Sequence, residues 1–373
     1  MVLRRAVWLI CLTSLSCGLV APAAFAVPAH PVGRSAPQLT TGRSVIASSP
    51  VPVVSPARRW QPGRFQNGVQ LYWHTNSPSS AVTQAASRTL DYVVSLGANS
   101  VGISFPIYTD GAKPSYVYAG PETPSPAVLG QVVAAARARG LRVMLRPLID
   151  ETNISLPGTG AWRGTIKPVN VPAWFASYGQ LLSSYAQSAA QSGVTELVLG
   201  VELSSLQQYT TQWQGVQTAV RQAGFQGTIS YAYNWAYWSA MPFTSLGVDA
   251  YPAINLGDKA TVAQLKAALV TWFKKRPLAT RQHLVVQETG IPAESGMYHH
   301  PWSFGSVGVP LNLMVQSNWF AAMCQAVHAA KMQGLYYWSI DSNTDPATVQ
   351  PADESSGNWI GRPAAMRIKQ CFA

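Results

Sequence analysis

Short apolar runs alternate with helical patterns along most of the chain, and this alternation constrains the fold more than any other feature. Each run is too short for a helix and too apolar for a strand with one face in water, so it indicates a strand buried on both faces. Strands are expected at residues 68–73, 100–107, 142–149, 196–203, 228–235, 246–251, 283–289 and 334–340. Helical patterns lie between or after them, at residues 79–96, 126–139, 172–192, 206–223, 262–275, 313–332 and 363–369.

The strand and helix unit recurs about eight times, which predicts an α/β fold of the (β/α)8 TIM-barrel type in one catalytic domain, residues 65–373. Glycines such as Gly97, Gly140 and Gly193 follow the helical patterns, where a left-handed residue ends a helix. No Gly-rich phosphate fingerprint follows the first strand, so a doubly wound sheet is disfavoured. The connection between the fifth and sixth strands lacks a convincing helical pattern.

The first 64 residues do not fit the repeat. Residues 1–26 combine Arg4 and Arg5, an apolar stretch and an Ala24-Phe25-Ala26 site, which predicts a secretory signal peptide and an extracellular or periplasmic protein. The arginine pair leaves the twin-arginine and the general export route both open. Residues 27–64 are rich in Pro and Ser, with five arginines and no acidic residue, which predicts a disordered linker. This linker is either a solvated spacer or an arm that adheres to anionic polymers.

Charge and cysteine content further limit the partners and the covalent links that we expect. Of 26 basic residues seven precede Phe65, which leaves 19 against 15 acidic ones in the barrel, so nothing requires a nucleic-acid partner. No stretch after the signal peptide is both apolar and long enough to span a membrane. We expect the protein to be a monomer. Cys324 and Cys371 remain as a pair in an oxidising compartment; a disulfide is expected, with two free thiols as the alternative.

Two glutamates lie at the polar ends of apolar runs, Glu202 in ELVLGVELSS and Glu288 in HLVVQETGIP. The chemistry of a parallel barrel collects at the strand C-termini, and two carboxylates facing each other there are the working groups of a glycosidase. An ion pair with Arg146 is the structural alternative for either one. Sugars need flat aromatic surfaces edged by hydrogen-bonding groups. Candidate substrate-binding residues at strand ends are Trp73, Arg146, Asn234, Trp235, Tyr251 and Trp338.

Other chemistries lack their sequence patterns. No H-E-x-x-H sequence occurs, and His299 and His300 are adjacent rather than four residues apart, so no metal is expected. No G-x-S-x-G elbow occurs, which disfavours a serine hydrolase. The DSNTD stretch that begins at Asp341 lacks the central Gly and distal Glu of a calcium loop. No cofactor is expected.

Several segments together resemble glycoside hydrolase family 113, a family of β-mannanases in the large retaining clan of (β/α)8-barrel glycosidases. They are AWRGTI from Ala161, WF at Trp174 with Tyr178, LGVEL from Leu199, VDAYP from Val248, QETG from Gln287, and YW at Tyr337. The resemblance implies Glu202 as acid/base, Glu288 as nucleophile, Tyr251 as its supporting tyrosine and Trp338 as the sugar platform. It also implies that Trp162 and Arg163 line the cleft.

One position departs from the clan, because Val201 stands where many members have an Asn that contacts the sugar 2-hydroxyl. The reaction class is therefore better defined than the sugar. The expected function is a secreted retaining β-glycoside hydrolase, endo-β-mannanase-like, acting on mannan-like poly- or oligosaccharides by double displacement. The alternatives are a β-glucanase, a xylanase or an exo-β-glycosidase on the same barrel, or a carbohydrate-binding barrel without activity.

Overall fold

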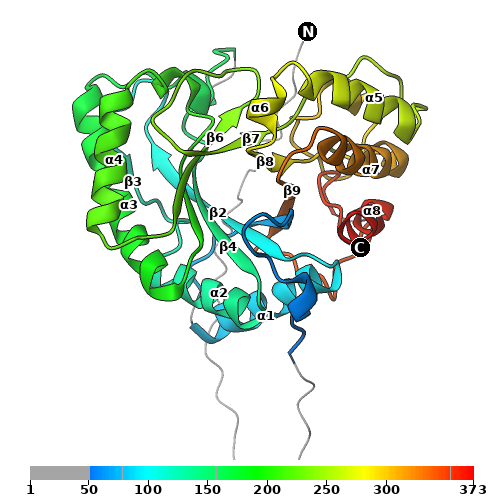
Figure 1. Ribbon diagram of the computed structural model, residues 1–373, viewed down its shortest axis with the longest axis horizontal. Coiled ribbons are helices and arrows are strands. Elements are labelled where there is room, and N and C mark those ends of the chain that lie inside the picture. Colours follow the sequence, from blue (N-terminus) through cyan, green and yellow to red (C-terminus); the bar gives the residue numbers. More distant parts are fainter. Residues whose placement is uncertain (1–50, 78, 156–157, 353) are drawn as a thin grey trace, which may run out of the picture. The chain divides into compact units, whose positions relative to one another are not determined.

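Eight parallel strands close into a barrel in the computed structural model, which describes residues 51–373 except 78, 156–157 and 353 (Figure 1). β1 pairs with both β9 and β2, and this second pairing closes the ring. The strands are β1 (Gln66–Tyr72), β2 (Ser100–Thr109), β4 (Arg142–Ile149), β5 (Glu196–Val201), β6 (Thr228–Asn234), β7 (Ser245–Asp249), β8 (Leu284–Thr289) and β9 (Gly334–Asp341). The expected (β/α)8 barrel is confirmed.

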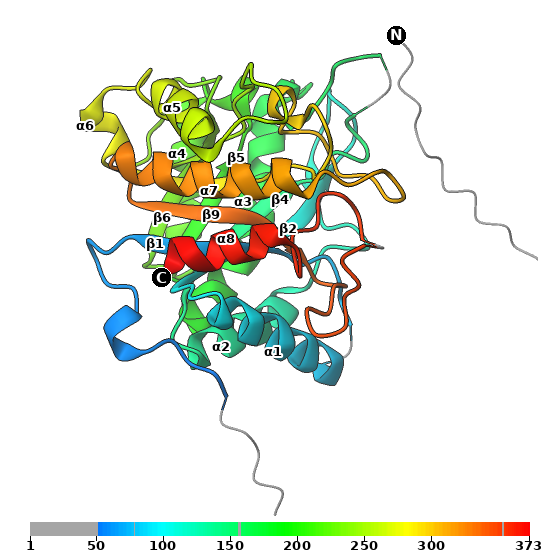
Figure 2. The same cartoon turned by 90° about the vertical axis from the view of Figure 1, so that its right-hand side faces the viewer.

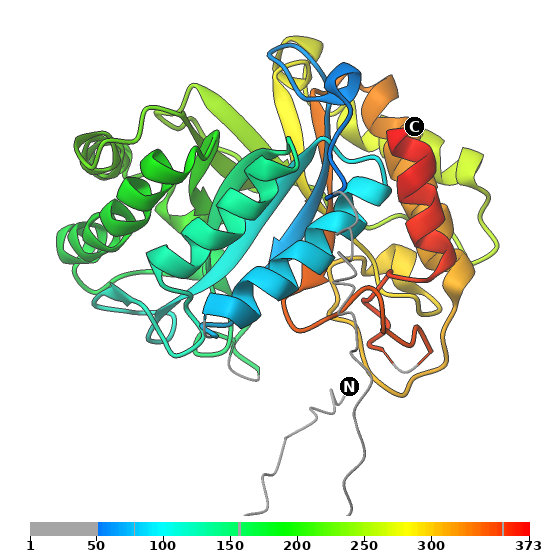
Figure 3. The same cartoon turned by 90° about the horizontal axis from the view of Figure 1, so that it is seen from below.

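Helices surround the strands (Figure 2 and Figure 3), and several pack on their neighbours: α1 on α2, α2 on α3, α3 on α4, and α7 on both α5 and α8. They are α1 (Ser79–Ser95), α2 (Pro126–Ala138), α3 (Val171–Ser192), α4 (Thr210–Gln222), α5 (Val262–Phe273), α6 (Leu278–Arg281), α7 (Leu313–Ala329) and α8 (Pro363–Phe372). Single 3₁₀ turns are η1 (Pro56–Arg58), η2 (Arg163–Thr165), η3 (Ser204–Leu206) and η4 (Met297–His299).

Two connections differ from a plain strand and helix repeat. Residues 235–244 join β6 to β7 without a helix, in line with the weak helical pattern there. A short strand that the sequence did not reveal, β3 (Val117–Tyr118), pairs antiparallel with the end of β2. Because β3 has only two residues, it leaves no periodic signal of its own.

Large side chains fill the barrel interior because glycines face them. A Cβ on Gly68 would lie 2.2 Å from the ring of Tyr336, and a Cβ on Gly247 would lie 2.1 Å from the side chain of Gln287. Tyr336 belongs to a buried apolar cluster with Met144, Leu148, Val198, Val201, Ala232 and Val285. The barrel is therefore a packed core, and its chemistry is confined to the ends of the strands.

Residues 51–64 pack on the barrel, although we expected them in the disordered linker. Val54 is buried, and its N–H donates to the carbonyl of Arg139 at 2.8 Å. Arg58 donates to the carbonyl of Phe372, and the guanidinium of Arg142 lies 4.8 Å from the ring centre of Trp60. The boundary at residue 65 is thus too late, because the apolar Val54 and Trp60 are enough to anchor this part of the segment. The rest of the linker and the predicted signal peptide lie outside the described residues.

A disulfide joins α7 to α8 between Cys324 and Cys371, which confirms the expected pairing. It fastens the final helix of the chain to the barrel. Within the described residues, no helix has the length and apolar character needed to cross a lipid bilayer.

Candidate active site

Polar side chains from three neighbouring strands meet at the C-terminal end of the barrel. Asn234 on β6 is in register with Asp249 on β7, and Asp249 is in register with Glu288 on β8. Glu202 follows β5 directly, and its N–H donates to the carbonyl of Ala232 on β6 at 2.9 Å. The strand register thus brings together both glutamates that the sequence indicated.

Glu288 is held by two donors, one on each carboxylate oxygen. Arg146 Nη1 donates to Oε2 at 2.6 Å, and the hydroxyl of Tyr251 donates to Oε1 at 2.7 Å. The other terminal nitrogen of Arg146 bonds to Asp249, and both of these side chains are fully buried. A cation and charge-assisted hydrogen bonds stabilise the negative charge of Glu288. Burial, with the charge of Glu288 next, raises the pKa of Tyr251 well above its usual range, so its hydroxyl stays a donor.

Glu202 has a different environment. Its φ of 54° places it in the left-handed region, an uncommon conformation for a residue other than glycine. Asn234 Nδ2 donates to its Oε1 at 2.7 Å. The pKa of Glu202 is raised to about 7. Burial is the largest cause and the charge of Glu288 adds to it, while the charge of Arg163 and the hydrogen bond from Asn234 oppose the shift. Near neutral pH this carboxyl therefore exists in both its protonated and its ionised form.

Arg163, in the turn η2, is positioned by Glu151. The Nε of Arg163 donates to Glu151 Oε1 at 2.7 Å, and its backbone N–H donates to the two oxygens of the same carboxylate at 3.1 and 3.2 Å. Both side chains are largely buried. The positive charge of Arg163 acts on both Glu202 and Glu288.

Aromatic rings lie in two groups at this end of the barrel. In the first, Tyr72 packs 5.9 Å from Trp338 and 5.2 Å from His74, measured between ring centres. In the second, Trp162 lies 5.9 Å from Tyr237, whose side chain is exposed. The first group belongs to β1 and β9 and the loop after β1, and the second to the loops after β4 and β6. Rings are therefore available on opposite sides of the barrel mouth.

Polar groups support the first aromatic group. The hydroxyl of Tyr72 donates to Asp150 at 3.0 Å, and the Nε2 of His74 lies 2.9 Å from Asp341. The hydrogen bond with Asp341 raises the pKa of His74, although burial opposes this shift. These bonds fix the rings beside Trp338, as a rigid sugar platform requires.

Three predicted substrate-binding residues have other positions. Trp73 is 1% exposed and belongs to the core. Trp235 is 5% exposed, and its ring stacks on Trp272 of α5 with 4.5 Å between ring centres. These two predictions are wrong, because neither ring has a free face for a sugar. Arg146, fully buried, binds Glu288 and Asp249, so it supports the glutamate instead of contacting substrate.

Sequence reasoning assigned no role to Asp249, Glu151 and Tyr237, although Asp249 is a polar residue at a predicted strand end. Asp249 had a detectable signal: it ends an apolar strand two residues after Gly247, on the same face. Glu151 and Tyr237 lie in loops, where no periodicity relates them to the glutamates. Only the fold shows which residues these loops bring to the site.

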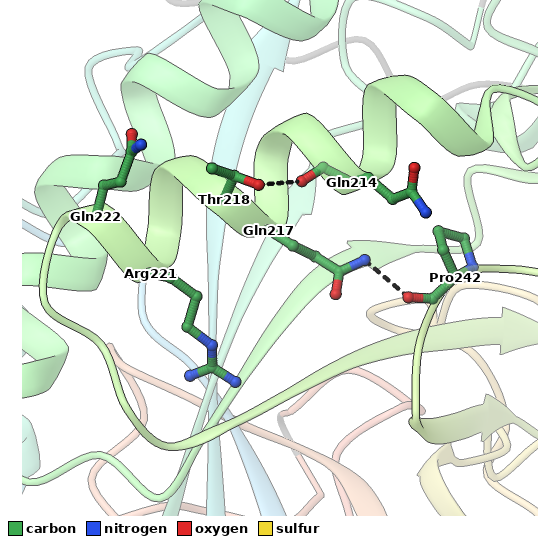
Figure 4. A pocket seen from close by; sticks show the side chains of 6 residues that line it. All are labelled: Gln214, Gln217, Thr218, Arg221, Gln222 and Pro242. Atoms are coloured by element: carbon green, nitrogen blue, oxygen red, sulfur yellow. Dashed lines mark hydrogen bonds between the residues drawn. The ribbon is translucent and has the colours of Figure 1, made fainter.

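A hollow lies on the outer helix α4 and is lined by Gln214, Gln217, Thr218, Arg221, Gln222 and Pro242 (Figure 4). Gln217 crosses it to donate to the carbonyl of Pro242 at 2.9 Å. None of the barrel-mouth carboxylates lines this hollow, so it is separate from the site.

At the barrel mouth, the carboxyl of Glu202 is protonated in part near neutral pH, and the carboxylate of Glu288 accepts hydrogen bonds from Arg146 and Tyr251. This division suits a proton donor and a nucleophile at a glycosidic bond, beside rings that can carry sugars. Barrel and site together define a glycoside hydrolase. The model of Glycoside Hydrolase Family 113 matches residues 72–357, and the chain belongs to this family, as its sequence segments indicated.

Solved structures agree with this assignment at the level of the fold. A GH113 β-1,4-mannanase superposes with a TM-score of 0.67 at 18% identity, over 83% of this chain and 99% of that one. The GH113 β-mannanase AaManA from Alicyclobacillus acidocaldarius, in complex with ManMIm, gives a TM-score of 0.66 at 21% identity, over 83% and 97%. Among curated proteins, no sequence matches this chain.

Proposed function

We propose that this glycoside hydrolase is a retaining β-mannanase that cleaves β-mannan-like poly- or oligosaccharides by double displacement. The observation that carries the proposal is the contrast between the two glutamates. Glu202 has its pKa raised to about 7, mainly by burial, whereas Glu288 accepts hydrogen bonds from Arg146 and Tyr251 on its two oxygens. One group is suited to give a proton and the other to attack.

In the first step, a carboxylate oxygen of Glu288 bonds to the anomeric carbon and the glycosidic C–O bond breaks. Glu202 gives its proton to the departing oxygen, which avoids an alkoxide leaving group. The negative charge leaves Glu288 as the glycosyl ester forms, and Arg146 and Tyr251 are placed to stabilise that charge before the attack and after hydrolysis.

In the second step, Glu202 is ionised and takes a proton from water. The resulting hydroxide oxygen bonds to the anomeric carbon, the ester bond to Glu288 breaks, and both carboxyl groups return to their starting states. Two inversions at one carbon leave the β configuration unchanged. This sequence needs Glu202 in both protonation states, which a pKa of about 7 supports near neutral pH.

The two aromatic groups favour action on a chain that extends past the cleaved bond in both directions. Tyr72 and Trp338 are placed to carry sugars on one side, and Trp162 and Tyr237 on the other. A mannan backbone needs such rings on both sides if it is cut internally, whereas an exo-acting enzyme needs them on one side only. We therefore propose endo action.

We also propose that the protein is exported, since residues 1–26 have the pattern of a signal peptide. Recovery of the protein from the culture medium, with its N-terminus at residue 27, tests the export; the protein remaining inside the cell would contradict it.

A panel of purified polysaccharides tests the activity, with the products followed by chromatography and by proton NMR during the first turnovers. Mannan-type chains should be cut into mixed oligomers whose new reducing ends are first β. Preference for β-glucan or xylan would keep the mechanism and change the substrate. Release of single sugars from one end would contradict endo action, and binding without products would indicate a carbohydrate-binding barrel.

A further inference from the structure

An arginine-lined pocket lies at the opposite end of the barrel from the two glutamates. Its lining is formed by Arg59, Trp60, Arg137, Gly140, Arg142 and Thr195. Arg142 is the first residue of β4 and Thr195 immediately precedes β5, which places the pocket at the N-terminal ends of the strands. Arg59 and Trp60 come from the segment 51–64 that packs on the barrel (Figure 2).

The pocket carries excess positive charge. Arg142 pairs with the buried Glu196. In the part of the chain that the structure describes, no carboxylate forms an ion pair with Arg59 or Arg137. Arg137 lies in the last turn of α2, where a cation also offsets the helix dipole, but Arg59 and Arg142 come from other segments. The helix dipole at the end of α2 therefore does not explain why three guanidinium groups line this pocket.

Two of the lining residues each carry a buried donor that has no hydrogen-bond partner among the described residues. The donors are the Nε of Arg142, a side chain only 4% exposed, and the Nε1 of Trp60. The guanidinium of Arg142 lies 4.8 Å from the centre of the Trp60 ring, so these two lining side chains contact each other. The side chains of Arg59 and Arg137 are exposed, so an anion that enters the pocket would balance their charge.

We propose that this pocket is a second, non-catalytic site that binds a phosphate-type oxyanion. A tetrahedral oxyanion offers several acceptors to guanidinium forks that approach from different segments, and arginine is well suited to this geometry. The phosphate group comes either from free inorganic phosphate or from a phosphate-bearing polymer outside the cell. The site does not depend on the sugar that the catalytic end accepts.

Thermal unfolding of the full exported protein tests the site, with inorganic phosphate added at an ionic strength kept constant with sodium chloride. Phosphate should raise the Tm with saturation, because a ligand that binds only the folded state stabilises it. The double variant Arg59→Ala/Arg137→Ala removes two exposed side chains and should lose this rise while keeping its glycosidase activity. The matched control Lys274→Ala/Lys275→Ala removes the same charge from exposed positions at the end of α5 and should keep the rise.

Affinity electrophoresis through a soluble poly(phosphodiester) distinguishes the two sources of phosphate. Retardation that is lost in the arginine variant, but not in the lysine control, would assign the site to a polymer; a Tm rise without retardation would assign it to the free ion. Absence of both effects in the parent protein would overturn the proposal. Equal effects in the arginine variant and the parent would also overturn it, because the binding would then be elsewhere.

Discussion

Replacing Arg163 by Gln should shift the alkaline limb of the pH profile of kcat/KM to higher pH. In the free enzyme this limb reports the loss of the acid proton from Glu202, whose pKa is raised to about 7, mainly by burial. The positive charge of Arg163 opposes that rise, so its removal favours the protonated form. An opposite charge at close range changes a carboxyl pKa by about 1–3 units. At the lower bound the limb moves to about pH 8, a change of about 1.36 kcal/mol in the free energy of ionisation.

The assay is kcat/KM against pH with a substrate whose leaving group needs protonation. Arg163→Lys keeps the cation and should keep the limb near 7, whereas Glu151→Gln loosens Arg163 and should give a smaller upward shift than Arg163→Gln. With a strongly acidic leaving group the limb should flatten in all four proteins, because no proton transfer is needed. An unmoved or lowered limb in Arg163→Gln would refute the role of burial and charge in setting the acid at Glu202.

Three further predictions concern Tyr251, the disulfide and the N-terminal segment. Tyr251→Phe removes a hydrogen bond to a charged group, so kcat/KM should fall by about 10- to 150-fold; a change below threefold would contradict its role at Glu288. Replacing Cys324 and Cys371 by Ala should lower the free energy of unfolding by about 4 kcal/mol, given their separation of 47 residues, and reductant should have no effect on the Tm of that variant. A protein that starts at Phe65 should have a lower Tm, because burying Val54 alone contributes about 1.5–3 kcal/mol; an unchanged Tm would show that residues 51–64 add nothing.

Features with a period were predictable from the sequence. Short apolar runs in the sequence indicate both β5 (Glu196–Val201) and β8, which ends at Thr289. The positions of Glu202 and Glu288 at the barrel mouth then follow from the fold class. The connection from β6 to β7 was also predictable, because its residues have no helical pattern and contain no helix in the structure.

The direction in which a strand-end side chain points was less predictable. Trp235 lies next to Asn234, and both are polar or aromatic residues at the end of β6, yet Asn234 reaches Glu202 while Trp235 packs against α5. One residue of register decides between the two faces of a strand, and strand ends drift by more than that in a sequence-based assignment. Glu151 was not predictable for another reason, because its contact with Arg163 depends on the course of a loop.

The covalent intermediate tests the central claim most directly. Glu202→Ala is mixed with an aryl β-mannoside whose leaving group needs no protonation, then denatured rapidly, digested and analysed by mass spectrometry. The glycosyl-enzyme should accumulate because no base activates water, so the peptide that contains Glu288 should carry the mass of one sugar. Added azide should discharge it as the β-glycosyl azide. A sugar attached to any other residue, or an α-glycosyl azide formed without any covalent adduct, would contradict double displacement through Glu288.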